Sequence, residues 1–254
     1  MINFVSLTNS GYNLFADSQI ENFKKDFLKN HILYLYCVDL ESYTYHSNKD
    51  LPDNIIILKM PEVEITGQHS YLMGRFKEMM RLKFPLIIEN ISKLNTAVWF
   101  IDNDVLFFND PESYIDYSKD IIFQADCHPE FSHSWVCTGC FWINNTENAI
   151  RLLKSVIELQ SKYDRGEQEL LNDYCESWPE GYVHVTPDKW GSILKFKQAN
   201  LEIFPYYLFQ SGHAAFKLDQ YDKYDCVMIH FNHESEYNKK VENFIKTKKH
   251  YNIN

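Results

Sequence analysis

Short apolar runs bounded by turn residues recur along the first half of the chain. Residues 2–7 (INFVSL), 32–38 (ILYLYCV) and 54–60 (NIIILKM) have the pattern of β-strands. Between the first two runs, residues 12–28 place apolar side chains three and four positions apart, as an amphipathic helix does. Strands that alternate with helices are typical of βαβ units. We therefore predict an α/β fold of a single domain, with a mixed, mostly parallel sheet flanked by helices.

A long helical pattern covers residues 67–93, and Pro85 lies inside it. Because proline has no backbone amide to donate, we expect the helix to break or bend near this residue. Residues 96–102 (TAVWFID) follow, apolar almost throughout, like a strand buried on both faces. Ligands of open α/β sheets bind where such strands end. The acidic residues after this run therefore lie where a functional site is expected.

The second half of the chain continues the alternation of strands and helices. A helix begins after Asn145 or Thr146, either of which is a suitable cap, and a shorter helix covers residues 167–175. No linker or internal repeat interrupts the pattern, so we expect one domain over residues 1–254. A basic C-terminal helix is expected over residues 237–254. The later predicted strands are residues 120–126, 139–144, 182–185 (YVHV), 201–205 and 226–231.

Charge and composition exclude several classes of protein. A formal net charge of −10 argues against nucleic-acid binding, which needs clustered Lys and Arg. No stretch approaches the roughly 20 apolar residues of a membrane span, and the N-terminal run lacks the basic flank of a signal peptide. We therefore expect a cytoplasmic protein. The basic segment 238–250 is expected to be either a solvated helix face or a peripheral contact with an anionic membrane surface.

The six cysteines are scattered without the rhythm of a disulfide framework, which suits a reducing compartment. Cys137 and Cys140 form a CxxC pattern, but a zinc site needs two further ligands at suitable spacing. A redox CxxC normally opens a helix, whereas strand-like residues follow this one. We interpret the spacing as coincidence.

Asp102 and Asp104 stand two positions apart at the end of the apolar run 96–102. In an extended backbone such residues point the same way, so their carboxylates can share a cation such as Mg²⁺ or Mn²⁺. The alternative is an Asx turn, but the apolar flanks would make an unpaired, buried acidic turn costly. Asn103 should point the other way and tolerate replacement.

Two known families place aspartates in this manner. Haloacid-dehalogenase-like phosphatases have an apolar strand followed by DxDx(T/V), and the resemblance would make Asp102 a nucleophile. Leu106 occupies the Thr or Val position, however, and that motif usually opens its domain. The phosphatase is therefore the weaker of the two hypotheses.

The second resemblance extends over roughly residues 4–240. A helix with Lys83 leads to VWFID, the two aspartates, VLFF and Asp110-Pro111, and the segments IIFQAD, CTGCFWINNT, GEQELLND and VMIHFN follow in order. This order resembles that of nucleotide-sugar-dependent glycosyltransferases of GT-A fold. It is most similar to their retaining branch, which includes the lipopolysaccharide galactosyltransferase and glycogenin types and the plant-type nucleotide-diphospho-sugar transferases.

The resemblance implies a nucleotide-binding half over residues 1–110 and a donor-sugar and acceptor half over residues 111–236. It also implies a site made from most of these segments. Asp102, Asp104 and His230 would hold Mn²⁺ or Mg²⁺, and Glu167 and Gln168 would lie beside the anomeric carbon of the donor sugar. Glu167 stands where the family has Asp, and it is also placed to be an ordinary first-turn acid of a helix. Lys83, or Arg75 or Arg81 of the same helical region, would reach phosphate. Residues that would contact the donor sugar are Gln124, Asp126, Thr138 and Gly139.

The exit of the first strand offers a place for the nucleotide. Backbone groups of Thr8 and Asn9 and the ring of Tyr12 would contact it there, and aromatic stacking on a base contributes about 1–3 kcal/mol. The alternative for each residue is a plain turn between strand and helix. Residues 210–213 (QSGH) have the character of a loop over an acceptor site.

One departure from the family lies after the predicted metal-binding His230. The lipopolysaccharide-type relatives continue as HxxGxxK, but this chain has His233 and Glu236 at the Gly and Lys positions. Lys239 or Lys240 could replace that lysine from farther along, which would fit the plant-type relatives better.

These observations predict a metal-dependent glycosyltransferase that moves a sugar from a nucleotide-diphosphate sugar, with a UDP-sugar the expected donor, to a hydroxyl of a glycan acceptor. The resemblance implies retention at the anomeric carbon, whereas Glu167 acting as a general base on the opposite face would give inversion. The alternatives are the phosphatase and a non-catalytic nucleotide-sugar-binding protein.

Overall fold

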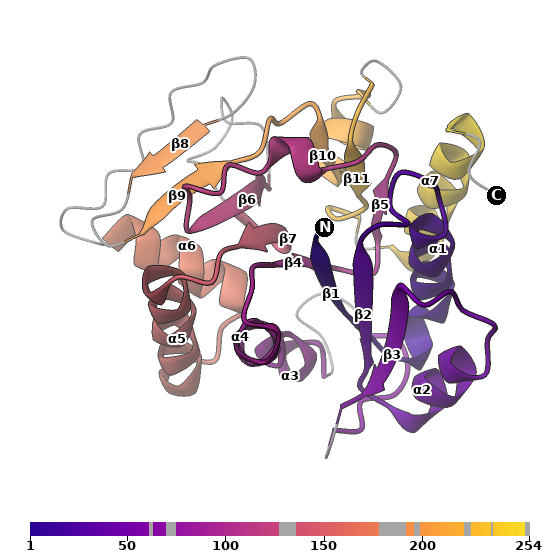
Figure 1. Ribbon diagram of the computed structural model, residues 1–254, viewed down its shortest axis with the longest axis horizontal. Helices are drawn as coiled ribbons and strands as arrows, with labels where there is room; N and C mark the ends of the chain where they lie inside the picture. The colour runs from indigo at the N-terminus through magenta and orange to yellow at the C-terminus, as the bar shows by residue number, and fades with distance from the viewer. Residues whose placement is uncertain are drawn as a thin grey trace.

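The structure of the protein is a computed structural model. It describes residues 1–60, 63–69, 75–126, 136–177, 192–195, 199–220, 225–234 and 236–251. An eight-stranded sheet crosses the described part of the molecule in the order β3-β2-β1-β4-β7-β6-β9-β8 (Figure 1). Its strands are β1 (Asn3–Thr8), β2 (Ile32–Cys37), β3 (Ile55–Lys59), β4 (Val98–Ile101), β6 (Ile121–Ala125), β7 (Val136–Ile143), β8 (Ser192–Lys195) and β9 (Asn200–Ile203).

The sheet is mixed and mostly parallel, as the sequence predicts. Strand β1 pairs in parallel with both β2 and β4, β2 with β3, and β6 with β9. Strand β7 is antiparallel to β4 and β6, and β8 is antiparallel to β9. The predicted strand at 182–185 lies outside the described residues.

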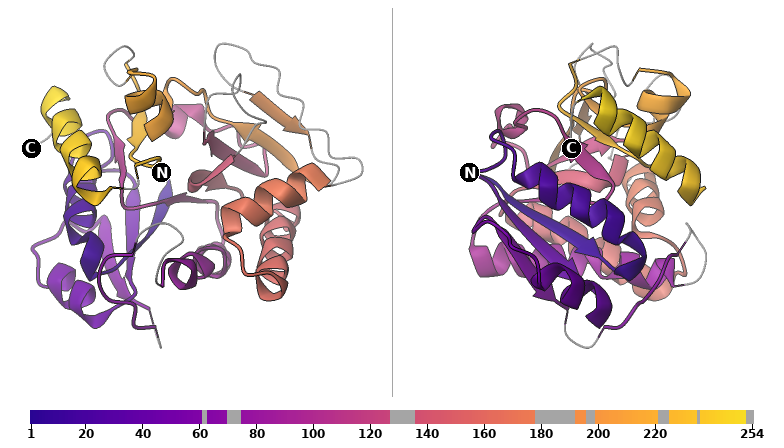
Figure 2. Two further views of the ribbon diagram at one scale, coloured as in Figure 1. Left: turned by 180° about the vertical axis from the view of Figure 1, so that it is seen from behind. Right: turned by 90° about the vertical axis from the view of Figure 1, so that its right-hand side faces the viewer.

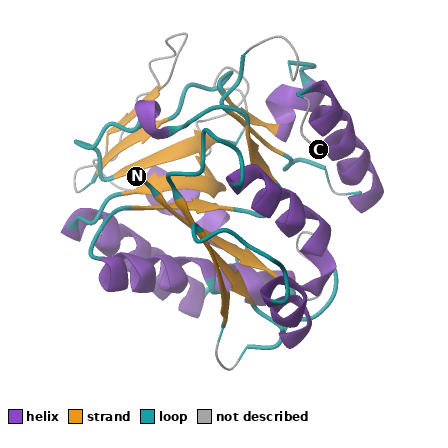
Figure 3. Cartoon of the chain, turned by 45° about the vertical axis from the view of Figure 1, so that its right-hand side comes forward, coloured by secondary structure: helices purple, strands orange, loops and turns teal. Residues whose placement is uncertain are grey.

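Helices lie on both sides of the sheet (Figures 2 and 3). They are α1 (Asn13–Phe23), α2 (Leu40–Ser47), α3 (Phe76–Arg81), α4 (Lys83–Leu94), α5 (Glu147–Lys162), α6 (Glu167–Ser177) and α7 (Tyr237–His250). The C-terminal helix α7 lies beside α1, where the rings of Phe15 and Phe244 stand 5.0 Å apart.

The central strand β4 shows why both faces of the sheet are covered. Val98 and Phe100 pack into the core that α4 and α5 cover, whereas Trp99 and Ile101 point into the core beneath α1. All four side chains are fully buried, and burying one such apolar side chain stabilises the fold by about 1.5–3 kcal/mol. The uninterrupted apolar run therefore matches a strand between two hydrophobic layers.

The helical region does break near Pro85. The helical pattern divides at Leu82, between α3 and α4, and Pro85 is the third residue of α4. The first amides of a helix have no partner within the helix, so the missing N–H of proline has no consequence there. Helix α5 is capped by Thr146, whose hydroxyl accepts a hydrogen bond from the amide of Ala149 at 3.2 Å.

A second, three-stranded sheet stands at the carboxyl end of β4. Its order is β10-β11-β5, from β10 (Phe209–Ser211), β11 (Met228–His230) and β5 (Val105–Phe107). Strand β5 is antiparallel to β11, which pairs Val105 with His230. The helix α2 and the short strands β5, β8 and β10 were not among the predicted elements.

Candidate active site

Two carboxylates and one imidazole converge where β4 ends. Asp102 follows β4, Asp104 precedes β5, and His230 is the last residue of β11. His230 Nε2 lies 3.3 Å from Asp104 Oδ1 and 3.8 Å from Asp102 Oδ2. One ligand atom from each residue falls within 4.8 Å of the others. Two carboxylate oxygens with one imidazole nitrogen are a donor set that suits Mn²⁺ or Mg²⁺.

Main-chain pairing holds these three residues together although they are distant in sequence. The amide of Phe231 donates to the carbonyl of Asp104 at 2.9 Å, which continues the β5–β11 ladder to the metal-ligand candidates. The amide of Asp102 donates to the carbonyl of Gly139 at 2.6 Å. This hydrogen bond places strand β7 beside the same three residues.

Gly139 keeps the space between the ligand candidates open. A Cβ atom at this position would lie 2.3 Å from His230 Cε1 and 2.4 Å from Asp102 Oδ2. Contacts this short do not occur, so any larger residue would displace a ligand side chain. The fit of the donor set and this close approach are both compatible with a cation held by the three residues.

Each of the two carboxylates has a lysine as an ion-pair partner. Lys240 Nζ of α7 lies 2.7 Å from Asp104 Oδ2, and the buried Lys83 Nζ lies 3.3 Å from Asp102 Oδ1. Burial works to raise the pKa of Asp104, but Lys240 and His230 outweigh it and hold that pKa below its ordinary value. Burial dominates at Asp102 and raises its pKa despite Lys83 and His230. Burial would lower the pKa of Lys83, yet Asp102 and Glu167 raise it.

Of the three basic candidates for phosphate contact, Lys83 alone is part of this cluster. Arg81 pairs with Asp164 at 3.0 Å and Arg75 with Glu78 at 2.8 Å, both on the exposed surface. Such exposed pairs contribute little to stability.

Glu167 and Gln168 begin α6 beside β7. Glu167 Oε1 accepts hydrogen bonds from Lys83 Nζ at 3.0 Å and from the Thr138 hydroxyl at 2.9 Å. Gln168 Oε1 accepts one from the amide of Thr138 at 3.0 Å. Glutamate has a longer side chain than the aspartate of the family pattern. Here its carboxylate reaches Lys83, which also faces Asp102.

A cavity of about 430 Å³ opens in front of this cluster. That volume is in the range of small-ligand sites. Asp102, Asp104 and His230 line it together with Lys83, Glu167 and Gln168. Further lining residues were not predicted from the sequence. Gln68, Phe76, Met79 and Met80 belong to a helical pattern that indicated only core packing, and Asn232 ends the VMIHFN segment but was given no role.

The three residues expected to contact the nucleotide have different surroundings. Tyr12 lines the cavity, and its hydroxyl donates to the carbonyl of His69 at 2.7 Å. Thr8 and Asn9 are fully buried, and neither is among the lining residues. Asn9 Nδ2 donates to the carbonyls of Ile65 and Gly67 at 3.1 and 2.8 Å. Its side chain therefore connects β1 to the segment after β3.

Gln124 also lies outside the cavity lining. It is fully buried, and its Oε1 is 3.0 Å from His230 Nδ1. The expected contact with donor-sugar hydroxyls does not fit this position, because no surface of the side chain faces the cavity. Asn103 differs from expectation as well, since it is buried and accepts a hydrogen bond from the Ser6 hydroxyl at 3.1 Å. We therefore no longer expect Asn103 to tolerate replacement.

Asp126 stands at the rim of the cavity between two residues of the segment after β11. Asn232 Nδ2 donates to Asp126 Oδ1 at 3.0 Å, and His233 Nε2 lies 3.2 Å from the same oxygen. His233 has a φ of 61°, a left-handed conformation that fits the glycine of the family pattern. Burial opposes protonation of His233, but Asp126 raises its pKa above the ordinary value. Gly212 of the 210–213 segment donates its amide to Asn232 Oδ1 at 2.6 Å.

Cys137 and Cys140 point in different directions from β7. Cys137 lines the cavity, whereas Cys140 packs in the core beneath α1 and accepts a hydrogen bond from Trp99 Nε1 at 3.4 Å. Burial raises the pKa of both thiols. This arrangement agrees with a coincidental CxxC.

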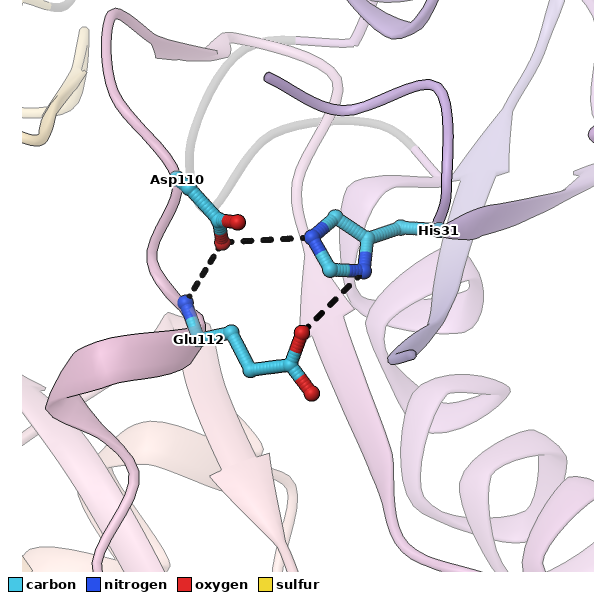
Figure 4. A group of neighbouring side chains, drawn as sticks. All are labelled: His31, Asp110 and Glu112. Atoms are coloured by element: carbon cyan, nitrogen blue, oxygen red, sulfur yellow. Dashed lines mark hydrogen bonds and ion pairs between the residues drawn. The ribbon is translucent and has the colours of Figure 1, made fainter.

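A second group of metal-ligating residue types lies away from the cavity and is made of His31, Asp110 and Glu112 (Figure 4). The amide of Ile2 donates to His31 Nδ1 at 3.1 Å, so Nδ1 must be unprotonated in the neutral ring. Nε2 then carries the proton and donates to Asp110 Oδ1 at 3.2 Å. Both ring nitrogens are engaged in hydrogen bonds. This group is therefore better explained as a structural contact between the start of β2 and the segment after β5 than as a metal site.

Phe244 of the basic helix α7 is buried, and Lys240 of the same helix pairs with Asp104. In the described part of the chain, no helix combines the length and apolar character required to cross a membrane. Peripheral membrane contact through α7 stays a prediction, as does the division of the domain into two halves.

Comparison with known proteins identifies the class. The family of nucleotide-diphospho-sugar transferases matches residues 30–244, and the chain belongs to this family. The protein is thus an enzyme that depends on a nucleotide sugar, which is the predicted class. The phosphatase hypothesis receives no support. A search of curated proteins finds no match to the sequence.

Solved glycosyltransferase structures share the fold. One is a glycosyltransferase involved in the glycosylation of the major capsid of PBCV-1, with a TM-score of 0.53 and 14% identity over 98% of both chains. Another is the apo structure of the WbbM bifunctional glycosyltransferase, with a TM-score of 0.61 and 11% identity. That match covers 99% of this chain and 51% of the other. At such identities the likeness concerns the fold alone, and it agrees with the predicted GT-A architecture.

Proposed function

We propose that the protein is a metal-dependent glycosyltransferase that transfers a sugar from a nucleotide-diphosphate sugar, with a UDP-sugar the expected donor, to a hydroxyl of a glycan acceptor with retention. The observation that carries this proposal is the convergence of Asp102, Asp104 and His230 at the cavity in a chain of the nucleotide-diphospho-sugar transferase family. These three residues would hold Mn²⁺ or Mg²⁺, which would stabilise charge on the leaving diphosphate as a Lewis acid.

Charge around the cavity suits a departing diphosphate. Lys240 at 2.7 Å from Asp104 and Lys83 at 3.3 Å from Asp102 place two cations beside the carboxylates. Preorganised positive groups stabilise charge that develops in a transition state without reorganising at that moment. Lys240 would take the part that the C-terminal lysine of the HxxGxxK pattern plays in related chains.

The surroundings of Glu167 and Gln168 favour retention. Glu167 Oε1 already accepts hydrogen bonds from Lys83 and Thr138, so it is poorly placed to take a proton from an acceptor. An electrostatic role beside the anomeric carbon suits it better, with Gln168 held next to it by the Thr138 amide. The acceptor hydroxyl would then attack on the face from which the diphosphate departs. NMR of the product anomer tests this, and an inverted product would contradict retention.

The decisive experiment measures release of nucleoside diphosphate from UDP-sugars in the presence of Mn²⁺. We expect Asp104→Asn to reduce turnover at least about 100-fold, because it removes an anionic ligand and unpairs Lys240. Thermal melting with and without UDP and Mn²⁺ serves as the control that the variant is folded. Full activity of Asp104→Asn in the presence of a chelator would contradict metal dependence.

A further inference from the structure

We propose that Gln124 is a positioning residue that sets the tautomer of His230, so that the unprotonated Nε2 faces Asp102 and Asp104. This inference rests on the proposed use of a metal ion. Gln124 is fully buried and does not line the cavity, so it would touch neither the metal ion nor the substrate.

The orientation of the Gln124 amide follows from its second partner. Gln124 Nε2 lies 3.3 Å from the carbonyl oxygen of Phe209, which can only accept a hydrogen bond. The NH₂ group must therefore point to Phe209, and Oε1 must point to His230 Nδ1, which is 3.0 Å away. The opposite orientation would bring two oxygens together.

An amide oxygen can only accept, so His230 Nδ1 must carry the proton. In the neutral ring this leaves a lone pair on Nε2, the nitrogen at 3.3 Å from Asp104 Oδ1 and 3.8 Å from Asp102 Oδ2. A metal-ligating imidazole requires this arrangement, with the other ring nitrogen donating to an oxygen. His31 has the reverse arrangement, because a backbone amide donates to its Nδ1.

Among the described residues, Cys137 also comes within hydrogen-bond distance of this nitrogen, with Sγ 3.5 Å from His230 Nδ1. A thiol that donated to Nδ1 would force the proton to Nε2 and turn an N–H toward the carboxylates. The Gln124 oxygen is closer at 3.0 Å and is a stronger acceptor than a thiol is a donor. The thiol itself receives the amide N–H of Gly139 at 3.4 Å. Gln124 therefore decides the tautomer.

The backbone is irregular at the position that carries this side chain. Phe123 of β6 pairs with Phe141 of β7, but the next residue, Gln124, pairs with Cys137, so the register shifts between them. Irregularities of this type redirect side chains and occur frequently next to active sites. A fully buried amide in such a strand is costly unless its polar atoms are satisfied. Here both ends are satisfied, one by His230 and one by Phe209.

The test compares Gln124→Leu with Gln124→Glu. We expect Gln124→Leu to weaken Mn²⁺ binding to the nucleotide-free protein about 10–100-fold, measured by electron paramagnetic resonance titration, because the partner of Nδ1 is lost. Gln124→Glu keeps an oxygen acceptor for Nδ1 but sets its other oxygen against the carbonyl of Phe209, so it should bind Mn²⁺ more tightly than Gln124→Leu without reaching the wild type. Gln160→Leu, another buried glutamine on α5, is the matched control and should bind Mn²⁺ like the wild type.

A spectroscopic readout tests the tautomer without any variant. Long-range ¹H–¹⁵N correlation of the metal-free wild type, with His230 assigned from a His230→Asn spectrum, should show the proton of the neutral ring on Nδ1. A proton on Nε2 would overturn the proposal, and so would wild-type Mn²⁺ affinity in folded Gln124→Leu. Absence of Mn²⁺ binding in the wild type would instead contradict the proposed function. The NMR assignment of the His230 tautomer would still test the role of Gln124.

Discussion

At the scale of single residues, one missing methyl group keeps the candidate site open. Gly139 approaches His230 and Asp102 so closely that a Cβ atom would overlap both side chains. The same residue accepts a hydrogen bond from the Asp102 amide through its carbonyl. Gly139 therefore fixes the position of one ligand candidate and leaves room for the others.

Gly139→Ala should weaken Mn²⁺ binding at least about tenfold and sugar transfer about 100-fold, because a displacement of catalytic groups by 1 Å can have that effect. Isothermal titration with Mn²⁺ and a coupled assay of UDP release measure the two quantities. Gly166→Ala is the control for the change itself, since a Cβ there meets nothing within 4 Å. Equal Mn²⁺ affinity of Gly139→Ala and the wild type would contradict the argument.

At the scale of elements, helix α7 completes a site that is otherwise built from strand ends. Tyr237 and Phe244 of this helix pack against the ring of Phe15 on α1. Tyr251, the residue after the helix, stacks on Phe108, the residue after β5, and these contacts hold the helix against the body of the protein. Lys240 on the same helix then reaches Asp104. The adjacent Lys239 points to the surface, where its Nζ lies 3.3 Å from Glu234.

This difference gives a matched pair of lysine variants. Lys240→Ala should lower kcat/KM for a UDP-sugar about 10–100-fold, because a contact to a charged group contributes about 1.5–3 kcal/mol. Lys239→Ala should remain within about twofold of the wild type, since exposed ion pairs contribute little. Steady-state kinetics with varied donor measures both. Equal losses in the two variants would indicate a general effect of charge on α7 rather than a contact of Lys240.

At the scale of the whole molecule, stability should depend on pH through a buried histidine far from the cavity. His46 of α2 is fully buried, and its Nε2 donates to Asn13 Oδ1 of α1 at 3.0 Å. Burial lowers the pKa of His46 to about 4 from its ordinary 6.5, although Asp17 opposes the shift. The unfolded chain therefore binds more protons than the folded protein between these two values.

The contribution of His46 to stability is complete above pH 6.5 and is lost as the pH falls toward 4. We expect the free energy of unfolding to be about 2 kcal/mol lower at pH 5 than at pH 7 from this residue, by the linkage of one proton. Urea unfolding at the two pH values measures the difference. His46→Gln cannot titrate and should have a smaller loss, whereas an identical loss in both proteins would contradict the assignment.

Much of the fold follows from local patterns. The strand β4 and the helices α1, α5 and α7 are visible in the sequence because apolar spacing reports which faces are buried. The short strands β5 and β10 are not, because each forms by pairing with β11, a segment distant along the chain. Pro85 indicated a nearby break in the helical pattern, and its place in the first turn of α4 agrees with a new helix that begins just before it.

The candidate site likewise has a part that the sequence predicts and a part that only the structure shows. The sequence by itself determined the chemical types and the strand-end positions of Asp102, Asp104 and His230, since a motif and its order along the chain contain both. Only the tertiary structure decided that Gln124 faces His230 rather than a sugar, and that Lys240 rather than Lys239 reaches Asp104. The physical reason is that a partner, a degree of burial and a tautomer depend on residues that are distant along the chain and become neighbours only when β6, β11 and α7 pack together.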